Sequence, residues 1–209
     1  MRRNPKPEAR CPLLCAWSLA ALVCLVTAGP AAAYSPVLTP EVVRQASTFY
    51  FSLNADSIPL PSEWAQPLPQ NQGAVMVVTP FIRLAMGLAT DEFIPNHQPA
   101  STLSLGIVDG LNQYFQNRLL LYVELNHTSI APPDPPKVEV LAGDGKVLAP
   151  TAESSDQRLR IISDTLYATR FRVEFALSDG IKPTDTIRVT VRAAGVPATV
   201  LTFNLARMR

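Results

Sequence analysis

The sequence predicts a mainly β protein, an antiparallel β-sandwich that is immunoglobulin-like or related, and two observations lead to this expectation. The first is a series of three runs near the C-terminal end, 168–177, 186–193 and 198–205, in which apolar and polar residues alternate. Because successive side chains of a strand point to opposite faces, each run would bury one face and expose the other to water. The second is that roughly eight or nine short strand-like runs, separated by turn residues, follow one another along the chain, as in sandwiches and barrels.

Residues 1–33 have the pattern of a cleaved secretory signal peptide. Four basic residues precede an apolar run over 13–28, and Ala31–Ala33 supplies the small residues that signal peptidase requires just before Tyr34. The alternative is an uncleaved membrane anchor, but the run is shorter than the roughly 20 residues that a membrane span needs. We therefore expect an exported protein, periplasmic or extracellular, with no stable membrane span after cleavage.

Composition excludes several kinds of chemistry from the mature chain. All three cysteines, Cys11, Cys15 and Cys24, lie in the leader, so disulfides, thiolate nucleophiles and cysteine-bound metals are not expected. The full chain has 18 basic and 17 acidic residues, and removing the four basic residues and one acidic residue of the leader leaves 14 and 16. No clustered basic stretch indicates a nucleic-acid partner.

Residues 34–73 are expected to form an N-terminal helix followed by a Pro-rich strap. The helix is predicted over 39–53, because Thr39 can cap it and Pro40 suits its first position. Its apolar stripe comprises Val42, Ala46, Phe49 and Leu53. A strand is the alternative, because Thr48 to Phe51 has high β-propensity.

The strap is predicted over 56–73, where four prolines favour an extended conformation. Trp64, the only tryptophan after the leader, lies in the middle of this stretch. It either pins the strap onto the body of the protein or serves as a platform for a ligand.

The sandwich domain is expected to span 74–209. Before the three C-terminal runs, strands are predicted over 74–79, 81–86, 102–108, 118–126, 137–141, 146–148 and 158–162. Pro80 implies a break, a bulge or a sheet edge between the first two of these strands. Turns are predicted at Asp109 with Gly110 and over Gly143–Gly145, where the pattern is that of a hairpin. Asp164 and Tyr167 resemble, over four residues, the tyrosine corner of immunoglobulin-like domains, which is a hint about the fold class.

Residues suited to catalysis are few, and we expect no enzyme, no cofactor and no metal. The sequence contains no nucleophile-elbow serine, no phosphate-binding glycine loop and no zinc-protease motif. The alternative is a metal-binding or hydrolytic site at His97, because nearby carboxylates such as Asp91 and Glu92 can fix the tautomer of an imidazole and raise its basicity. Asn126 begins a glycosylation sequon with His127 and Thr128.

The leading hypothesis is a non-enzymatic exported protein that contacts another envelope or extracellular protein in adhesion, assembly or a structural role. Apolar sheet edges and the strap suggest docking by strand addition or by exchange of the N-terminal segment. The outward arginines of the C-terminal runs, Arg170, Arg172, Arg188 and Arg192, are expected to form a stripe on one sheet or simply a solvated face. The alternative is a glycan-binding module that uses exposed aromatic side chains, namely Trp64, Tyr114, Phe115 and Tyr122.

Overall fold

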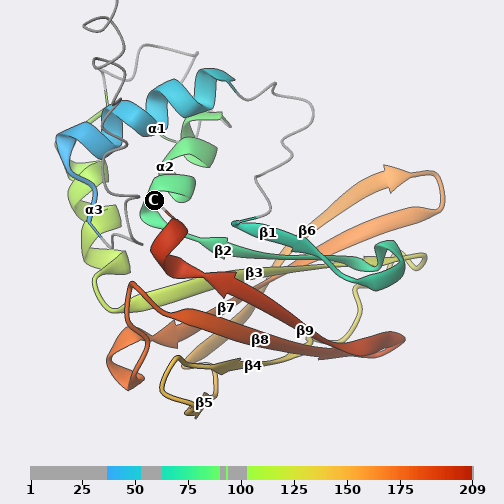
Figure 1. The fold of residues 1–209 in the computed structure, drawn as a ribbon. Helices are drawn as coiled ribbons and strands as arrows, with labels where there is room; N and C mark the ends of the chain where they lie inside the picture. Colours follow the sequence, from blue (N-terminus) through green and yellow to red (C-terminus); the bar gives the residue numbers. More distant parts are fainter. Residues whose placement is uncertain (1–36, 53–62, 90–92, 94–102, 209) are drawn as a thin grey trace, which may run out of the picture. The chain divides into compact units, whose positions relative to one another are not determined.

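The computed structural model describes residues 37–52, 63–89, 93 and 103–208. The predicted leader, the first part of the strap (56–62) and the predicted site at His97 lie outside the described residues. Within them the protein is mainly β, with two antiparallel sheets and a few helices, as the sequence predicts (Figure 1).

The strands are divided between a five-stranded sheet and a four-stranded sheet. In spatial order, the first contains β1 (Ala65–Pro67), β2 (Gly73–Val78), β3 (Arg118–His127), β7 (Leu166–Ala176) and β6 (Ala152–Ser163). The second contains β5 (Val147–Leu148), β4 (Lys137–Leu141), β8 (Thr186–Ala193) and β9 (Val196–Asn204). The helices are α1 (Pro40–Ser52), α2 (Pro80–Ala89) and α3 (Leu105–Phe115), with short 3-10 turns at Pro69–Asn71, Leu177–Asp179 and Leu205–Arg207.

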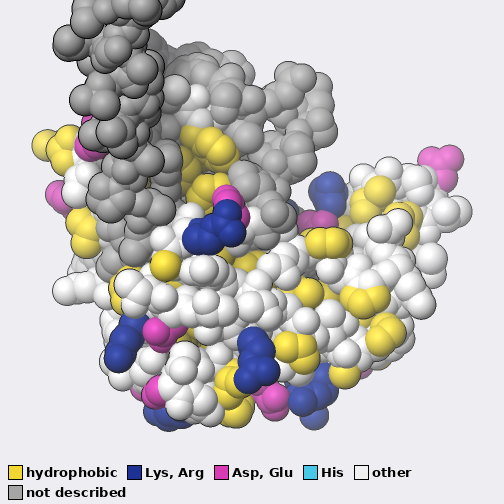
Figure 2. Space-filling model, in the orientation of Figure 1, with side chains coloured by type: hydrophobic (Ala, Val, Ile, Leu, Met, Phe, Trp, Pro, Cys, Tyr) yellow, Lys and Arg dark blue, Asp and Glu magenta, His cyan; other side chains and the backbone are white. Residues whose placement is uncertain are grey.

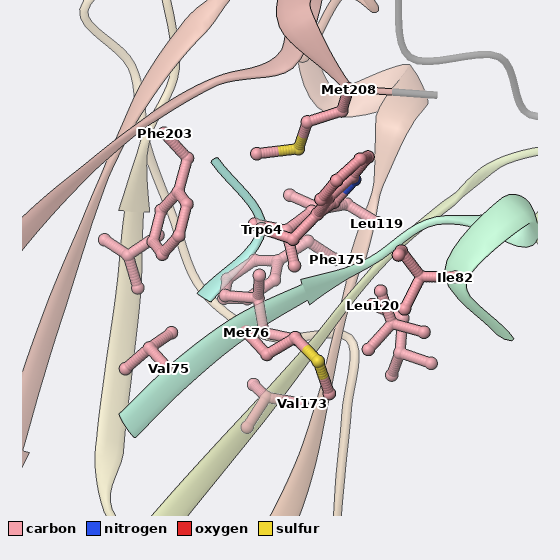
Figure 3. Close-up of a cluster of buried hydrophobic side chains, with 14 of the residues drawn as sticks. Trp64, Val75, Met76, Ile82, Leu119, Leu120, Val173, Phe175, Phe203 and Met208 are labelled. Carbon is pink, nitrogen blue, oxygen red and sulfur yellow. The ribbon is translucent and has the colours of Figure 1, made fainter. Parts of the chain in front are cut away.

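The alternating runs bury the faces that the sequence predicts. In the five-stranded sheet, Val123 of β3 pairs with Phe171 of β7, and both side chains are buried. The neighbouring pair, Tyr122 with Arg172, points to the opposite face. Buried side chains from the two sheets and the helices form one hydrophobic cluster, part of which is drawn in Figure 3.

Two segments predicted as strands contain helices instead: 81–86 lies in α2, and α3 begins at Leu105, within the predicted strand 102–108. The hydroxyl of Thr79 accepts a hydrogen bond from the amide of Ile82 (3.2 Å), and Pro80 occupies the first position of α2. Pro80 therefore starts a helix, where the sequence suggested a break between strands. The side chain of Ser104 caps α3 in the same way, through the amide of Ile107.

Neither of these helices has a sequence pattern that separates it from a strand. α2 is buried on almost every side, so its apolar residues show no helical period. α3 contains Asp109 and Gly110, which the sequence assigned to a turn, and a glycine inside a helix costs about 1 kcal/mol relative to alanine. The predicted turn is wrong because the cap at Ser104 and the burial of Phe115 hold the helix together.

The tyrosine corner suggested by Asp164 and Tyr167 is a hairpin turn within one sheet. Ser163 of β6 pairs with Leu166 of β7, so the two residues between them make the turn. A tyrosine corner instead closes a loop that crosses between sheets. The predicted hairpin around Gly143–Gly145 is confirmed, since β4 and β5 pair antiparallel on either side of it.

The last part of the predicted strap is an edge strand. Its β1 segment pairs with β2, and the chain then turns through Gln70 and Asn71, which have left-handed φ angles of 56° and 57°. Gly73 follows with φ 136°, and a Cβ at this position would lie 1.8 Å from the carbonyl oxygen of Glu124. Only glycine allows β2 to approach β3 this closely.

Candidate binding surface

The outward face of the five-stranded sheet carries a continuous set of charged and aromatic side chains, which we call the arginine–tyrosine face. It comprises Tyr114, Arg118, Tyr122, Glu124, Arg160, Arg170, Arg172 and Glu174. Most of these residues occupy the outward positions of β3 and β7, between the residues that fill the core. Tyr114 comes from the last turn of α3, and Arg160 from β6.

Glu174 is the centre of this network, although only 8% of its surface is exposed. One carboxylate oxygen, Oε1, accepts hydrogen bonds from the Tyr114 hydroxyl (2.7 Å) and from Nε of Arg172 (2.9 Å). The other oxygen lies 3.7 Å from the Arg118 guanidinium. The two guanidinium groups also lie against the Tyr114 ring, 4.5 Å (Arg118) and 5.1 Å (Arg172) from its centroid.

The network lowers the pKa of Glu174 and raises the pKa of Tyr114, so both values move further from neutral pH. Burial alone would raise the pKa of Glu174, but hydrogen bonds from Tyr114 and Arg172 outweigh it and hold that pKa below its usual value. The pKa of Tyr114 is raised, first by burial and then by its hydrogen bond to the Glu174 carboxylate. An efficient general acid or base needs a pKa near the working pH. The pair therefore suits a fixed, charged surface better than proton transfer.

The second half of the face is organised around Glu124. Its carboxylate pairs with Arg160 at 2.5 Å and with Arg170 at 3.3 Å, and the Arg170 guanidinium lies 5.2 Å from the centre of the Tyr122 ring. The Arg160 side chain is 61% exposed, whereas that of Glu124 is 18% exposed. At this pair, a molecule that approaches the face meets the Arg160 guanidinium before the Glu124 carboxylate.

The structure brings together four of the residues that the sequence singled out, namely Tyr114, Tyr122, Arg170 and Arg172. Arg188 and Arg192 lie on β8 in the other sheet, so the single arginine stripe is wrong. Arg192 pairs there with Glu139 at 2.9 Å. Sequence reasoning missed Arg118 and Glu124, although their alternation with the buried leucines of β3 marks both as outward-facing.

The predicted aromatic platform is not assembled, because two of its four members are buried. Trp64 is 6% exposed and stacks on Phe81, with ring centroids 6.2 Å apart and planes 12° from parallel. Figure 3 places it beside Leu119 and Met208 in the core. Phe115 is fully buried. Trp64 therefore anchors the described part of the strap to the core. Of the predicted platform, only Tyr114 and Tyr122 remain, and each lies against an arginine side chain.

Asn126 and His127 at the end of β3 are engaged in local hydrogen bonds. The side-chain amide nitrogen of Asn126 donates a hydrogen bond to the carbonyl oxygen of Asn71 at 2.6 Å. This nitrogen is the atom to which a glycan would be attached. The two ring nitrogens of His127 lie 2.7 Å from Ser129 O and 2.8 Å from Thr169 Oγ1. Among the described residues, no three His, Cys, Asp or Glu side chains are grouped to hold a metal, and no helix is long and apolar enough to cross a membrane.

The four outer strands of the two sheets differ in how open their edges are. β5 has two residues, and β1 has three, of which one is a proline. Carbonyl groups of β9 and of the turn before it, at Thr202 and Gly195, accept hydrogen bonds from the side chains of Gln66 and Gln72. By contrast, β6 has twelve residues and pairs with β7 alone among the described strands. It is the longest open edge in the described part of the chain.

A small hollow lies beside the β6 edge. It measures about 160 Å³ and is lined by Pro135, Pro136, Glu153, Ser154, Phe171, Arg172 and Val173. Further along β6, Ile161 is 70% exposed and Ile162 is 42% exposed. The β6–β7 hairpin, orange at the right of Figure 1, carries hydrophobic side chains at its surface in Figure 2. Exposed apolar residues beside an open edge are typical of interaction sites.

Comparisons with known proteins give no family for this chain. No family model matches, and no curated protein matches. One solved structure that matches this chain is a novel protein of unknown function from Burkholderia pseudomallei, with 10% sequence identity and a TM-score of 0.36. The alignment covers 82% of this chain and 92% of that one.

Proposed function

We propose that this chain is a non-enzymatic, exported binding domain that acts through contact with another protein of the cell envelope or the extracellular space. The observation that carries the proposal is the open edge of β6, which is twelve residues long and includes two exposed isoleucines, Ile161 and Ile162. An unpaired edge presents backbone donors and acceptors to any extended segment of suitable sequence. The arginine–tyrosine face adjoins that edge. Its fixed charges would favour partners of complementary charge.

The edge of β6 is favoured over the other three because they carry features that limit pairing. Very short strands, edge prolines and side-chain covers are the usual means by which proteins block unwanted strand addition. β1, β5 and β9 each show one of these features, whereas β6 has twelve residues and no proline. This difference supports a functional use of the β6 edge.

For the architecture, we propose a β-sandwich in the broad sense. Support comes from the shared core, to which both sheets contribute their alternating buried residues. Side-chain bridges from Gln66 and Gln72 to the second sheet add to this support. An immunoglobulin-like relationship has less support, because the hairpin at Asp164 replaces the corner that suggested it.

Export predicts a defined N-terminus for the mature protein. Signal peptidase acts after a small-residue site that follows the apolar run, which places cleavage after Ala33. The protein recovered from its source cells is therefore expected to begin at Tyr34. N-terminal sequencing with intact-mass measurement tests this, and a recovered chain that still carries residues 1–33 contradicts cleavage.

The role of the hairpin is tested by Ile161→Lys. A lysine at this exposed edge position places charge in the proposed interface while leaving the core untouched, so folding should be unchanged within about 0.5 kcal/mol. We expect at least a tenfold loss of the main protein cross-link formed in intact source cells. The measurement is quantitative cross-linking mass spectrometry with a C-terminal tag on the protein.

Val200→Lys is the matched control for that variant. Val200 is also an exposed apolar residue on an outer strand, 58% exposed on β9, but in the other sheet. Cross-links should survive this change. Equal loss in both variants, or no loss in either, would show that the β6 hairpin is not the contact surface.

A further inference from the structure

The β6 edge has two faces of different chemistry, and together they define what kind of segment it can accept. Side chains of an added strand alternate between the two faces of the sheet. One set would join the arginine–tyrosine face, and the other would lie on the side of the small hollow. The register supports this division, because Ser154 pairs with Arg172 on the outward side and Glu153 pairs with Val173 on the inward side.

The outward side favours acidic residues. An added strand would lie next to Ser154 and Arg160, with Arg172 one strand further in, and neighbouring strands are about 4.8 Å apart. The Arg172 and Arg160 side chains are 38% and 61% exposed. The side chains of Glu174 and Glu124 are less exposed, at 11% and 18%.

An acidic residue in β6 itself restricts where on the outward side a carboxylate of the partner would be attracted. Asp156 occupies the register position opposite Arg170, so that arginine lies between Glu124 and an acidic position of β6. Arg172 instead has the small, uncharged Ser154 as its neighbour on the edge strand. A carboxylate of the partner is therefore best placed beside Ser154 or Arg160.

The inward side favours apolar residues. Apart from Glu153, Ser154 and Arg172, the hollow is lined by Pro135, Pro136, Phe171 and Val173. A small apolar side chain would cover the prolines and the edge of the core there. Glu153 on its border would repel a second carboxylate. The two sides together select a segment that alternates acidic and apolar residues.

We infer that the partner docks on β6 through an extended, alternating acidic and apolar segment. The inference rests on the proposed function, in which the β6 edge binds a protein. The pairing is short, because β6 keeps a regular register with β7 only from Ala152 to Asp156 and shifts before Arg160. A bulge of this kind interrupts regular pairing. About five residues of the partner would therefore add to the sheet.

The test uses two capped seven-residue peptides, one alternating valine and glutamate and the other alternating valine and lysine. Fluorescence anisotropy measures their binding to the mature chain, and hydrogen exchange locates the contact. We expect the glutamate peptide to bind at least tenfold more tightly and to protect amides in Ala152–Asp156. Both effects should weaken as salt concentration rises, because the attraction is partly between exposed charges.

A charge reversal on the edge supplies the decisive variant. Arg160→Glu should weaken the glutamate peptide at least tenfold and strengthen the lysine peptide. Arg192→Glu is the control, because Arg192 forms a comparable exposed pair with Glu139 on the other sheet. It should change neither affinity. Thermal unfolding of both variants verifies that each one is folded.

The outcomes separate this inference from the proposed function. If neither peptide binds at about 1 mM, or both bind equally, the alternating acidic segment is wrong, even if Ile161→Lys still removes the cellular cross-link. If the glutamate peptide binds as expected but the cross-link does not depend on Ile161, the site exists and the proposed function fails. A dimer that Ile161→Lys dissociates would make a second copy of this chain the occupant, which also overturns the inference.

Discussion

Replacing Trp64 with alanine is expected to lower the free energy of unfolding by about 3–5 kcal/mol. The indole is 6% exposed and packs against Phe81 and Phe49, so truncation removes buried area and leaves a cavity between α1, α2 and the strap. For a chain of this size the loss corresponds to a fall in Tm of roughly 6–20 °C. Thermal and denaturant unfolding followed by circular dichroism measure it without using the tryptophan signal.

Two further variants define what the Trp64 result means. Trp64→Phe keeps an aromatic ring in the site and should cost about half as much or less. Leu105→Ala removes a large apolar side chain that is 80% exposed, and should stay within about 0.5 kcal/mol of the parent. A cost below about 1 kcal/mol for Trp64→Ala would mean that the strap is not pinned. The ligand-platform interpretation of Trp64 would then return.

The sequence predicts an element correctly where one face of that element is exposed to solvent and the other is buried. β3, β7, β8 and β9 each have one largely polar face, so their period of two is visible and the residues of their core-facing sides are predicted correctly. α2 is buried on all sides over most of its length, so its apolar run is compatible with either a helix or a strand. Thr79 and Pro80 form a helix start signal, but a proline between two apolar runs also has the pattern of a break between strands.

The candidate surface was harder to predict, because it depends on which strands are neighbours. Alternation shows that Arg170, Arg172 and Arg188 point outward, but it does not show to which sheet each strand belongs. β7 and β8 follow one another in the chain and lie in different sheets, which separates Arg188 from the other two. The Glu174 network also needs Tyr114 from α3, a segment for which the sequence predicted no helix.

The second large effect is expected for Glu174→Gln, which should cost about 2–3 kcal/mol at neutral pH. Removing one partner of a buried ion pair typically costs about 3–5 kcal/mol, because the other charge is left uncompensated. The lower figure applies because the Arg172 side chain is 38% exposed and water screens part of its charge. Glu139→Gln is the matched control. Its pair with Arg192 is about half exposed on both sides, so its loss should cost at most about 0.5 kcal/mol.

Acid pH distinguishes loss of charge from loss of shape at Glu174. Its pKa is lowered in the folded protein, so its stabilising contribution is complete above the usual value of 4.5 and is lost as the pH falls through the folded value. The stability difference between the parent and Glu174→Gln should therefore shrink as urea unfolding is repeated from pH 7 down to about pH 3. A difference that stays constant over this range would mean that the amide fits the site poorly for steric reasons. The carboxylate would then not be the group that holds Arg172 and Tyr114 in place.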